Sequence, residues 1–589
     1  MEQKRRDFGV LYGQKTTEDA LLIYSSYEDS KASPQTGDFI VLAQRDEVGR
    51  KFLARVEAEI YDEDPIFRSQ DKTLVAVHYA RIAERELSKR DKQKMFSYTY
   101  KVKILGTFSN DGYDFSTAVR KLPTVSYHAR HLNKKEFEKI LNKTNENGIK
   151  LGNLCVGDDV MDEREVLFDI KKLRANRTMV FAQSGFGKTN LMKVLISRAF
   201  KDEEVGKLIF DLEGEYFLKS SIQKTYGIAD IDHHLFRDNL VVYTDKKIPD
   251  NYNDKFIEGG EVKVDFSKDF NVGDIISTAI GLTNAGRNFL EYLSSLPDQS
   301  VVQKFFGKVF DESDPTVIRE FAYKNFSKYF QEKKKQGVED DIEANVSQAS
   351  KSMLGGVIRQ IRGYTSIHKK GSDFVSSVLK YLSQNKTVIV DFSLLDNNEA
   401  SLISTVLVKR LFEHNKSKFT IAGVEDSSIP GIENAINAVI FVEEAQNVLS
   451  DEFVRSNANP FIKVAKQGRK FSLGLVAITQ RPSAISEEIR SQAENFFVLH
   501  MGNSKDIKAL VESNINYSGV ISKFIQSETI PGNLYMVSAK QSFAIPLKVN
   551  WFEELIHNNV YKELKFSADD YPELLEAVKT DAKSKYTKY

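Results

Sequence analysis

Residues 178–189 read Thr178-Met-Val-Phe-Ala-Gln-Ser-Gly-Phe-Gly-Lys-Thr189. The stretch begins as an apolar strand, breaks into a loop with two glycines, and ends in Gly-Lys-Thr. A helix-like run, Asn190-Leu-Met-Lys-Val-Leu-Ile-Ser, follows at once. A strand before such a loop and a helix after it distinguish a phosphate-binding loop from a chance match, because backbone N–H groups then point at the phosphates. The sequence therefore predicts nucleotide binding here.

The residue types of this loop suit ATP and Mg²⁺. Lys188 is expected to reach the β- and γ-phosphates, and Thr189 to hold Mg²⁺ through its hydroxyl. Ala182 stands where the first glycine is usual and is small enough for a tight turn, whereas Phe186 stands where a small polar residue is common. We expect the nucleotide to contact Ser184, Gly185, Phe186, Gly187, Lys188, Thr189 and Asn190.

Composition describes an ordinary globular protein. The 589 residues suggest roughly two to four domains. Lys plus Arg and Asp plus Glu both number 83, so any surface that binds nucleic acid must be local. One cysteine, Cys155, excludes an intrachain disulfide framework and a Cys-based zinc site. No signal-peptide core and no apolar run of about 18 residues appears, so we expect a cytoplasmic chain without a membrane span.

The hydrophobic pattern changes along the chain. Short β-rich runs punctuated by Gly, Asp, Ser and Pro predict a small N-terminal barrel or sandwich. From about Leu151, buried-type strands alternate with helical stretches, which indicates an α/β fold with a parallel sheet covered on both faces. The predicted domains are a β-rich segment 1–125, a linker 126–150, a core in two parts 151–265 and 386–567, a helical insertion 266–385, and a polar tail 568–589.

Hydrolysis of ATP also needs a carboxylate near Mg²⁺ and another that orients water. The apolar strand Ala438-Val-Ile-Phe-Val ends in Glu443-Glu444, and ligands of open α/β sheets sit at strand C-termini. We expect Glu443 to support the Mg²⁺ shell, although Asp is more usual there, and Glu444 to be the base that activates water. The alternative is a pair of surface acids at a strand end.

Two further strands end in acids. Asp211 ends one of them and could lie near Mg²⁺ or the γ-phosphate. For Glu215, a little further on, a role near the metal and a helix-capping role are equally favoured. Asp391 ends the third strand of this kind, and there a structural role is favoured over a catalytic one.

Two further residue types complete the predicted site. Gln480 follows an apolar strand, where an amide can sense the γ-phosphate. Arg469 precedes that strand and is a candidate arginine finger, which would stabilise transition-state charge on a neighbouring subunit's nucleotide. Arg177 is a weaker second candidate, and an ordinary surface arginine is the alternative for Arg469.

The order of motifs resembles the HerA branch of the HerA/FtsK superfamily of hexameric ATPases. The motifs are Gly187-Lys-Thr189, Asp211-Leu-Glu-Gly-Glu-Tyr216, a helical insertion, Val390-Asp-Phe-Ser393, Glu443-Glu-Ala-Gln446, Gln467-Gly-Arg-Lys470 and Ile478-Thr-Gln-Arg-Pro-Ser483. The β-rich start is similar to the HAS barrel of that family, and Pro531–Val537 with Ile545–Val549 resembles its closing hairpin.

The resemblance implies a RecA-like P-loop ATPase core with a helical insertion. It also implies a homohexameric ring that moves double-stranded DNA with ATP, beside an effector such as a nuclease or a sirtuin-like NADase, in some relatives for antiphage defence. The family roles fall on Lys188, Thr189, Asp211, Glu443, Glu444, Gln480 and Arg469.

Two functional hypotheses stay open at this point. The first is a DNA translocase or helicase, for which basic residues near the end of the insertion are candidate DNA contacts: Arg359, Arg362, Lys369 and Lys370. The second is an ATP-regulated scaffold that assembles an effector enzyme and has little motor activity of its own. Stimulation of ATP hydrolysis by DNA distinguishes them.

Overall fold

A computed structural model describes residues 7–15, 20–26, 34–63, 96–109, 115–141, 148–156, 159–219, 225–231, 234–270, 272, 283–334, 348–419, 431–451, 459–539, 541, 543–554 and 556. The chain divides into two compact units. The first unit comprises Met1–Asp169, Ala182–Lys188 and Phe496–Asn550, and the second comprises Ile170–Phe181, Thr189–Asn495 and Trp551–Tyr589. The polar tail expected at 568–589 lies outside the described residues.

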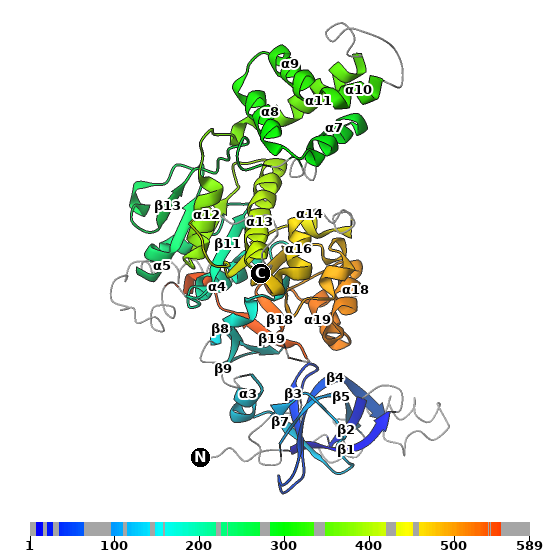
Figure 1. The fold of residues 1–589 in the computed structure, drawn as a ribbon. Coiled ribbons are helices and arrows are strands. Elements are labelled where there is room, and N and C mark those ends of the chain that lie inside the picture. The colour runs from blue at the N-terminus through cyan, green and yellow to red at the C-terminus, as the bar shows by residue number, and fades with distance from the viewer. Residues whose placement is uncertain are drawn as a thin grey trace, which may run out of the picture. The chain divides into compact units, whose positions relative to one another are not determined.

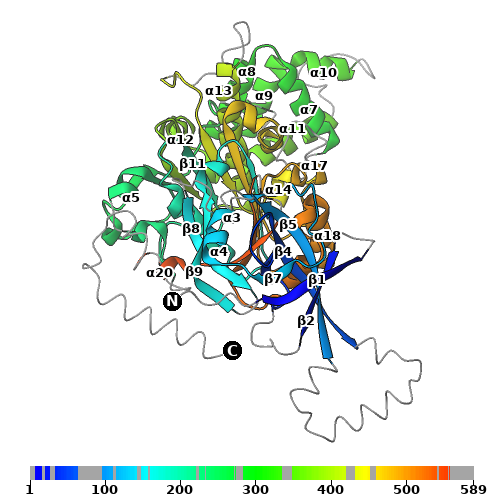
Figure 2. The same ribbon diagram turned by 90° about the horizontal axis from the view of Figure 1, so that it is seen from below.

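An antiparallel sheet forms the N-terminal part of the first unit (Figure 2). Its strand order is β2-β1-β7-β3-β4-β5-β6, and β2 also pairs with β5. The strands are β1 (Asp7–Lys15), β2 (Ala20–Ser26), β3 (Phe39–Ala43), β4 (Lys51–Glu63), β5 (Phe96–Phe108), β6 (Phe115–Ser116) and β7 (His128–His131).

The sheet extends beyond the expected boundary at residue 125. Strand β7 lies in the segment predicted to be a linker, yet it pairs with both β1 and β3. Its short sequence His-Ala-Arg-His carries no hydrophobic alternation, so pattern alone does not reveal it. The core beneath the sheet includes Phe8, Leu42, Phe52 and Tyr100, all buried.

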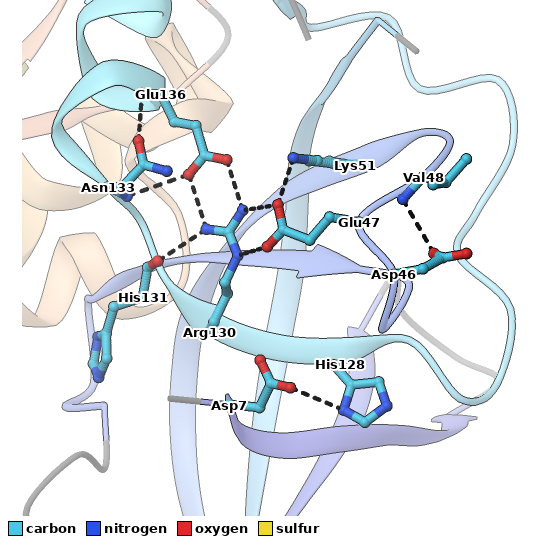
Figure 3. Close-up of polar contacts among 10 residues, drawn as sticks. All are labelled: Asp7, Asp46, Glu47, Val48, Lys51, His128, Arg130, His131, Asn133 and Glu136. Atoms are coloured by element: carbon cyan, nitrogen blue, oxygen red, sulfur yellow. Dashed lines mark hydrogen bonds and ion pairs between the residues drawn. The ribbon is translucent and has the colours of Figure 1, made fainter. Parts of the chain in front are cut away.

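One buried arginine connects β7 to the turn between β3 and β4 and to the helix α3 (Lys134–Leu141) (Figure 3). Arg130 donates to Glu136 at 2.7 and 2.9 Å and to Glu47 at 2.7 Å. Lys51 also donates to Glu47, at 2.7 Å. Asn133 and Glu136 exchange hydrogen bonds at the start of α3, the arrangement of a capping box.

The first unit also contains a second set of antiparallel strands, in the order β17-β18-β19-β8-β9. Their bounds are β8 (Gly148–Val156), β9 (Asp159–Asp169), β17 (Asn495–Val498), β18 (Asn533–Val537) and β19 (Ile545–Val549). Strands β18 and β19 form the expected hairpin, and β19 pairs with β8. Gly152 permits that pairing, because a Cβ there would overlap the carbonyl oxygen of Lys548.

The second unit contains a parallel sheet of order β13-β12-β14-β11-β15-β16-β10. The strands are β10 (Arg177–Phe181), β11 (Gly206–Asp211), β12 (Leu240–Tyr243), β13 (Ile257–Gly260), β14 (Thr387–Asp391), β15 (Ala438–Val442) and β16 (Leu473–Thr479). Every residue of β11, β14, β15 and β16 is buried, as expected of a parallel sheet covered on both faces. The predicted α/β fold is therefore present.

Helices cover this sheet, and a helical group extends from it (Figure 1). The covering helices include α4 (Lys188–Ala199), α12 (Phe374–Ser383), α13 (Asn397–Phe419) and α16 (Pro460–Gln467). The helical group is α7 (Asn284–Ser295), α8 (Gln299–Asp311), α9 (Pro315–Asn325), α10 (Ser327–Lys334) and α11 (Gln348–Arg362), and it has its own aromatic core. Within the described ranges, no helix is both long and apolar enough to cross a bilayer.

Candidate nucleotide site

The loop between β10 and α4 has the backbone shape that its glycines allow. Gly185 and Gly187 have φ angles of +85° and +93°, in a region that side chains disfavour. The Phe186 carbonyl accepts a hydrogen bond of 3.0 Å from the N–H of Gly532, and a Cβ on Gly187 would lie 3.2 Å from the same nitrogen. A glycine at position 187 therefore permits both the positive φ angle and the close approach of Gly532.

The unusual Phe186 has a partner inside the first unit. Its ring packs against the ring of His500, with centroids 4.0 Å apart and the planes tilted by 32°. The N–H of Gln183 donates to the His500 carbonyl at 3.0 Å, and the Gln183 side chain accepts from Gly502 at 3.2 Å. The segment after β17 thus supports the loop through a ring contact and backbone hydrogen bonds.

Helix α4 carries the Thr189 hydroxyl, which donates to Glu215 Oε2 at 2.8 Å. The sequence allows Glu215 a role near the metal or a helix-capping role, and the structure places it beside Thr189, the predicted Mg²⁺ ligand. A hydroxyl and a carboxylate are hard oxygen ligands, the kind that Mg²⁺ prefers, so the residues present fit this ion. The side chain of Asn190 accepts from the N–H of Phe552 at 2.8 Å, so its amide oxygen is used within the second unit.

Asp211 shapes the loop that carries Glu215. Its carboxylate accepts from the backbone N–H groups of Gly214, Glu215 and Tyr216 at 2.8, 3.1 and 2.9 Å, and the side chain is fully buried. Burial, together with the nearby Glu443 carboxylate, raises the pKa of Asp211 to about 8 despite these hydrogen bonds. A cation bound at this edge would favour the ionised form.

Glu443 lies at the end of β15 and points to the same loop. Its Oε1 accepts from the hydroxyl of Tyr216, and its Oε2 accepts from the N–H of Leu212 at 3.4 Å. Burial, followed by the Glu443 charge, raises the pKa of the Tyr216 hydroxyl well above its usual range, so Tyr216 stays a donor. Tyr216 was not identified from the sequence, although it is the last residue of the quoted Asp-Leu-Glu-Gly-Glu-Tyr motif.

Glu444 is held by two side-chain amides. Gln446 donates to its Oε2 at 2.6 Å, and Gln480 donates to its Oε1 at 3.2 Å. Its backbone φ is +44°, an uncommon conformation for a residue with a side chain, and such residues cluster at functional sites. The structure thus brings two of the predicted site residues, Glu444 and Gln480, into contact and adds Gln446.

Asp391 is opposite Asp211 in the pairing of β14 with β11. Its carboxylate accepts from Thr244 Oγ1 at 2.7 Å and from Ser393 Oγ at 2.6 Å, and Lys246 Nζ lies 3.3 Å away. These contacts stabilise the strand ends and agree with the structural role that sequence reasoning favoured.

The two candidate arginine fingers differ in their surroundings. Arg177 pairs with Glu494 through a bond of 2.5 Å and also donates to the carbonyl of Ala465 and the side chain of Gln492. This bonding occupies its guanidinium within the second unit. Arg469, in the turn Gly468–Phe471, is exposed. We therefore retain Arg469 alone as the candidate finger.

Three of the four basic residues suggested as DNA contacts have partners within the second unit. Arg362 donates to the carbonyls of Val309 and Glu312 at the end of α8. Lys369 pairs with Glu261, and Lys370 with Asp311, each at 2.8 Å. These contacts give the three residues a structural explanation that the sequence did not reveal. Arg359 is exposed on α11.

Comparison with known proteins adds an independent finding. Residues 149–411, from β8 into α13, match the family model "Helicase HerA, central domain". The "DNA double-strand break repair helicase HerA" of Pyrococcus furiosus is 22% identical over 383 residues, covering 61% of this chain and 62% of the relative. The protein of that name from Saccharolobus solfataricus is 24% identical over 439 residues, covering 73% and 74%. Residues 149–411 of this chain thus match the central domain of HerA helicases, and more than half of the chain is similar to HerA proteins.

The chain spans less than two thirds of some relatives: 62% of the Pyrococcus protein and 63% of the HerA of Sulfurisphaera tokodaii. Among solved structures, the bacterial conjugative coupling protein TrwB matches with a TM-score of 0.42 at 11% identity, covering 74% of this chain and 94% of that structure. VirB4 of Thermoanaerobacter pseudethanolicus matches with a TM-score of 0.40 at 14% identity, covering 69% and 97%.

Proposed function

We propose that this chain is an ATP-hydrolysing DNA translocase or helicase. The observation that carries the proposal is the connected set of side chains at the carboxyl ends of β11, β15 and β16. Thr189 contacts Glu215, the loop of Glu215 contacts Glu443 through Tyr216, and Glu444 contacts Gln480. In a parallel sheet this edge is where nucleotides bind, and a hydroxyl, carboxylates and an amide are the groups that ATP hydrolysis requires.

Each residue has one role in this proposal. The loop 184–187 and Lys188 bind the phosphates, and Thr189 with Glu215 holds Mg²⁺, which neutralises charge on the phosphates when bound. Glu443 supports that region through the loop 212–216. Glu444 accepts a proton from the attacking water, and Gln480 lies beside it to sense the γ-phosphate. Arg469 acts on the nucleotide of a neighbouring subunit, for which its exposure is suited.

The DNA substrate is proposed from the relatives, whose names describe DNA repair helicases. With 83 basic and 83 acidic residues, the chain has no overall attraction for DNA, which suits a hexameric ring in which only pore residues contact the phosphates. A HAS-like barrel at the N-terminus, an effector partner such as a nuclease or a sirtuin-like NADase, and a role in antiphage defence come from the family resemblance and belong to the same proposal.

Steady-state ATP hydrolysis by the full chain, with and without linear double-stranded DNA, tests the proposal. We expect Mg²⁺-dependent hydrolysis that DNA stimulates several-fold at low salt, and a loss of stimulation as salt rises, because phosphate contacts release counterions. Lys188→Ala is the control and should be inactive. Hydrolysis that is indifferent to DNA at every salt concentration would contradict the motor and favour the ATP-regulated scaffold.

A further inference from the structure

Gln446 supplies a second side-chain amide to Glu444, and the proposed mechanism gives this amide no role. Gln446 is the first residue of the short helix α14 (Gln446–Leu449). Its side-chain nitrogen donates to Glu444 Oε2 at 2.6 Å, a shorter distance than the 3.2 Å bond from Gln480 to Oε1. A hydrogen bond to a carboxylate is among the stronger kinds in proteins.

The hydroxyl of Thr479 fixes which way the Gln446 amide faces. Thr479 Oγ1 donates to Gln446 Oε1 at 2.5 Å and accepts from the N–H of Arg481 at 2.9 Å. Because the backbone of Arg481 supplies a donor, the hydroxyl proton is directed to the Gln446 oxygen. The amide nitrogen of Gln446 must then face Glu444, so the orientation follows from the network. Thr479 is fully buried at the end of β16.

The backbone holds the same geometry from the other side. Glu444 has a φ of +44°, and the next residue, Ala445, donates its N–H to the carbonyl of Ile478 at 2.9 Å. The N–H of Asn447 donates back to the Glu444 carbonyl at 2.8 Å. A strained conformation persists only where its surroundings determine it. Here the turn after β15 is attached to β16 by a backbone bond from Ala445 and by the side-chain chain Glu444–Gln446–Thr479.

We propose that Gln446 is a positioning residue for the water-activating Glu444, with its own orientation set by the Thr479 hydroxyl. This inference rests on the proposed ATP hydrolysis. The end of β16 then contacts Glu444 in two ways. Gln480 donates to it directly, and Thr479 acts on it indirectly through Gln446. A side chain that only completes helix α14 would leave catalysis unchanged when replaced by one of similar size.

The test uses the full chain and compares kcat with KM for ATP. Gln446→Met keeps the length of the side chain and removes both hydrogen bonds. Thr479→Val removes the hydroxyl at constant volume, and Thr479→Ser restores it. We expect Gln446→Met and Thr479→Val each to lower kcat roughly tenfold to a hundredfold with KM changed less than about twofold. Thr479→Ser should stay within about threefold of the native kcat.

Two further variants sharpen the result. Asn447, next to Gln446, has an exposed side chain, so Asn447→Ala is the matched control and should hydrolyse ATP at the native rate. Combining Gln446→Met with Thr479→Val should lower kcat no more than either change alone, because both remove the same chain of contacts. Thermal unfolding of each variant shows that the fold is retained, and Thr479→Ser gives a hydroxyl-bearing comparison if Thr479→Val does not fold.

The outcomes separate this inference from the proposed function. A native kcat in Gln446→Met, while Glu444→Gln is inactive, would overturn the positioning role and leave ATP hydrolysis standing. A raised KM with unchanged kcat would also overturn it, because Gln446 would then act in binding. If the native chain hydrolysed no ATP with or without DNA, the proposed function itself would fail, and the positioning role with it.

Discussion

Glu215 lies on the loop 211–216, and Glu443 accepts hydrogen bonds from the same loop. The sequence predicts Glu443 as the carboxylate near Mg²⁺, and the structure adds Glu215, which accepts a hydrogen bond from the Thr189 hydroxyl. Asp211 causes this by binding the N–H groups of Gly214 and Glu215. Gly214, at φ +67°, packs so closely on Lys246 and Ser393 that a Cβ would overlap their side chains. The loop therefore turns back and places Glu215 beside Thr189. We infer that Glu215 is the acid nearest the proposed Mg²⁺ ion.

A change at Glu215 should alter how the rate of ATP hydrolysis depends on the Mg²⁺ concentration. We expect Glu215→Gln to raise the Mg²⁺ concentration for half-maximal hydrolysis by roughly tenfold, because a metal-site contact typically contributes 10- to 100-fold in affinity. The measurement is ATP turnover against Mg²⁺ at saturating ATP. Glu213→Gln, two residues away and exposed, should behave as the native chain. Equal Mg²⁺ curves for the two variants would remove Glu215 from the metal region.

Arg130 lies between the carboxylates of Glu47 and Glu136 and so connects three segments of the N-terminal sheet and its helix. Its contacts join β7 to the turn that carries Glu47 and to the start of α3. Burial opposes its charge, but the hydrogen bonds that Arg130 donates to Glu136 and Glu47 outweigh that effect and raise the pKa of Arg130. Burial likewise would raise the pKa of Glu47, but hydrogen bonds from Lys51 and Arg130 lower it to about 2 from 4.5. Breaking either pair would leave a buried guanidinium with fewer acceptors.

The sheet should consequently weaken in acid. Because the pKa of Glu47 is depressed in the folded state, its contribution is present above pH 4.5 and is lost as the pH falls toward 2. We expect Glu47→Gln to lower the free energy of local unfolding at β7 by about 2 kcal/mol at pH 7. This figure is discounted because Glu47 is partly exposed. The difference from the native chain should shrink below pH 4.5.

Hydrogen-exchange protection of the β7 amides measures this locally. Glu165→Gln is the control, since Glu165 pairs with Lys150 at 2.9 Å but is 55% exposed. A Glu47 variant with native protection at pH 7 would contradict the assigned contribution.

Arg469 can act as an arginine finger only if the chain assembles with a neighbouring subunit whose nucleotide it contacts. Arg177 is bonded to Glu494 within its own unit, whereas Arg469 is exposed on the second unit. A guanidinium delivered to a nucleotide in another subunit stabilises transition-state charge and contributes on the order of 10³-fold or more. The proposed ring therefore needs both a binding loop and a finger at each active interface, supplied by different chains.

Mixing two inactive variants tests this arrangement. Lys188→Ala lacks the phosphate contact and Arg469→Ala lacks the finger, and each alone should hydrolyse ATP at a few per cent of the native rate or less. Mixed rings contain interfaces where an intact loop faces an intact arginine, so a fraction of the activity should return. Arg177→Ala is the comparison: because Arg177 pairs with Glu494 of its own chain, this variant should be active alone, and mixing it with Lys188→Ala should only dilute its activity. Absence of recovery at all mixing ratios would rule out a finger from another chain.

The amino-acid sequence alone predicts the α/β class, the helical insertion, the Gly-Lys-Thr loop and the likeness to HerA proteins. These properties depend on short-range patterns: glycine at positive φ, buried strands, helical spacing and motifs in a fixed order. The tertiary structure alone decided that β7 joins the N-terminal sheet, that β8 pairs with β19, that Thr189 meets Glu215, and that Gln446 faces Glu444. Each of these depends on a contact between segments far apart in the chain, or on a backbone strain that such contacts maintain. Local hydrophobic pattern does not encode either one.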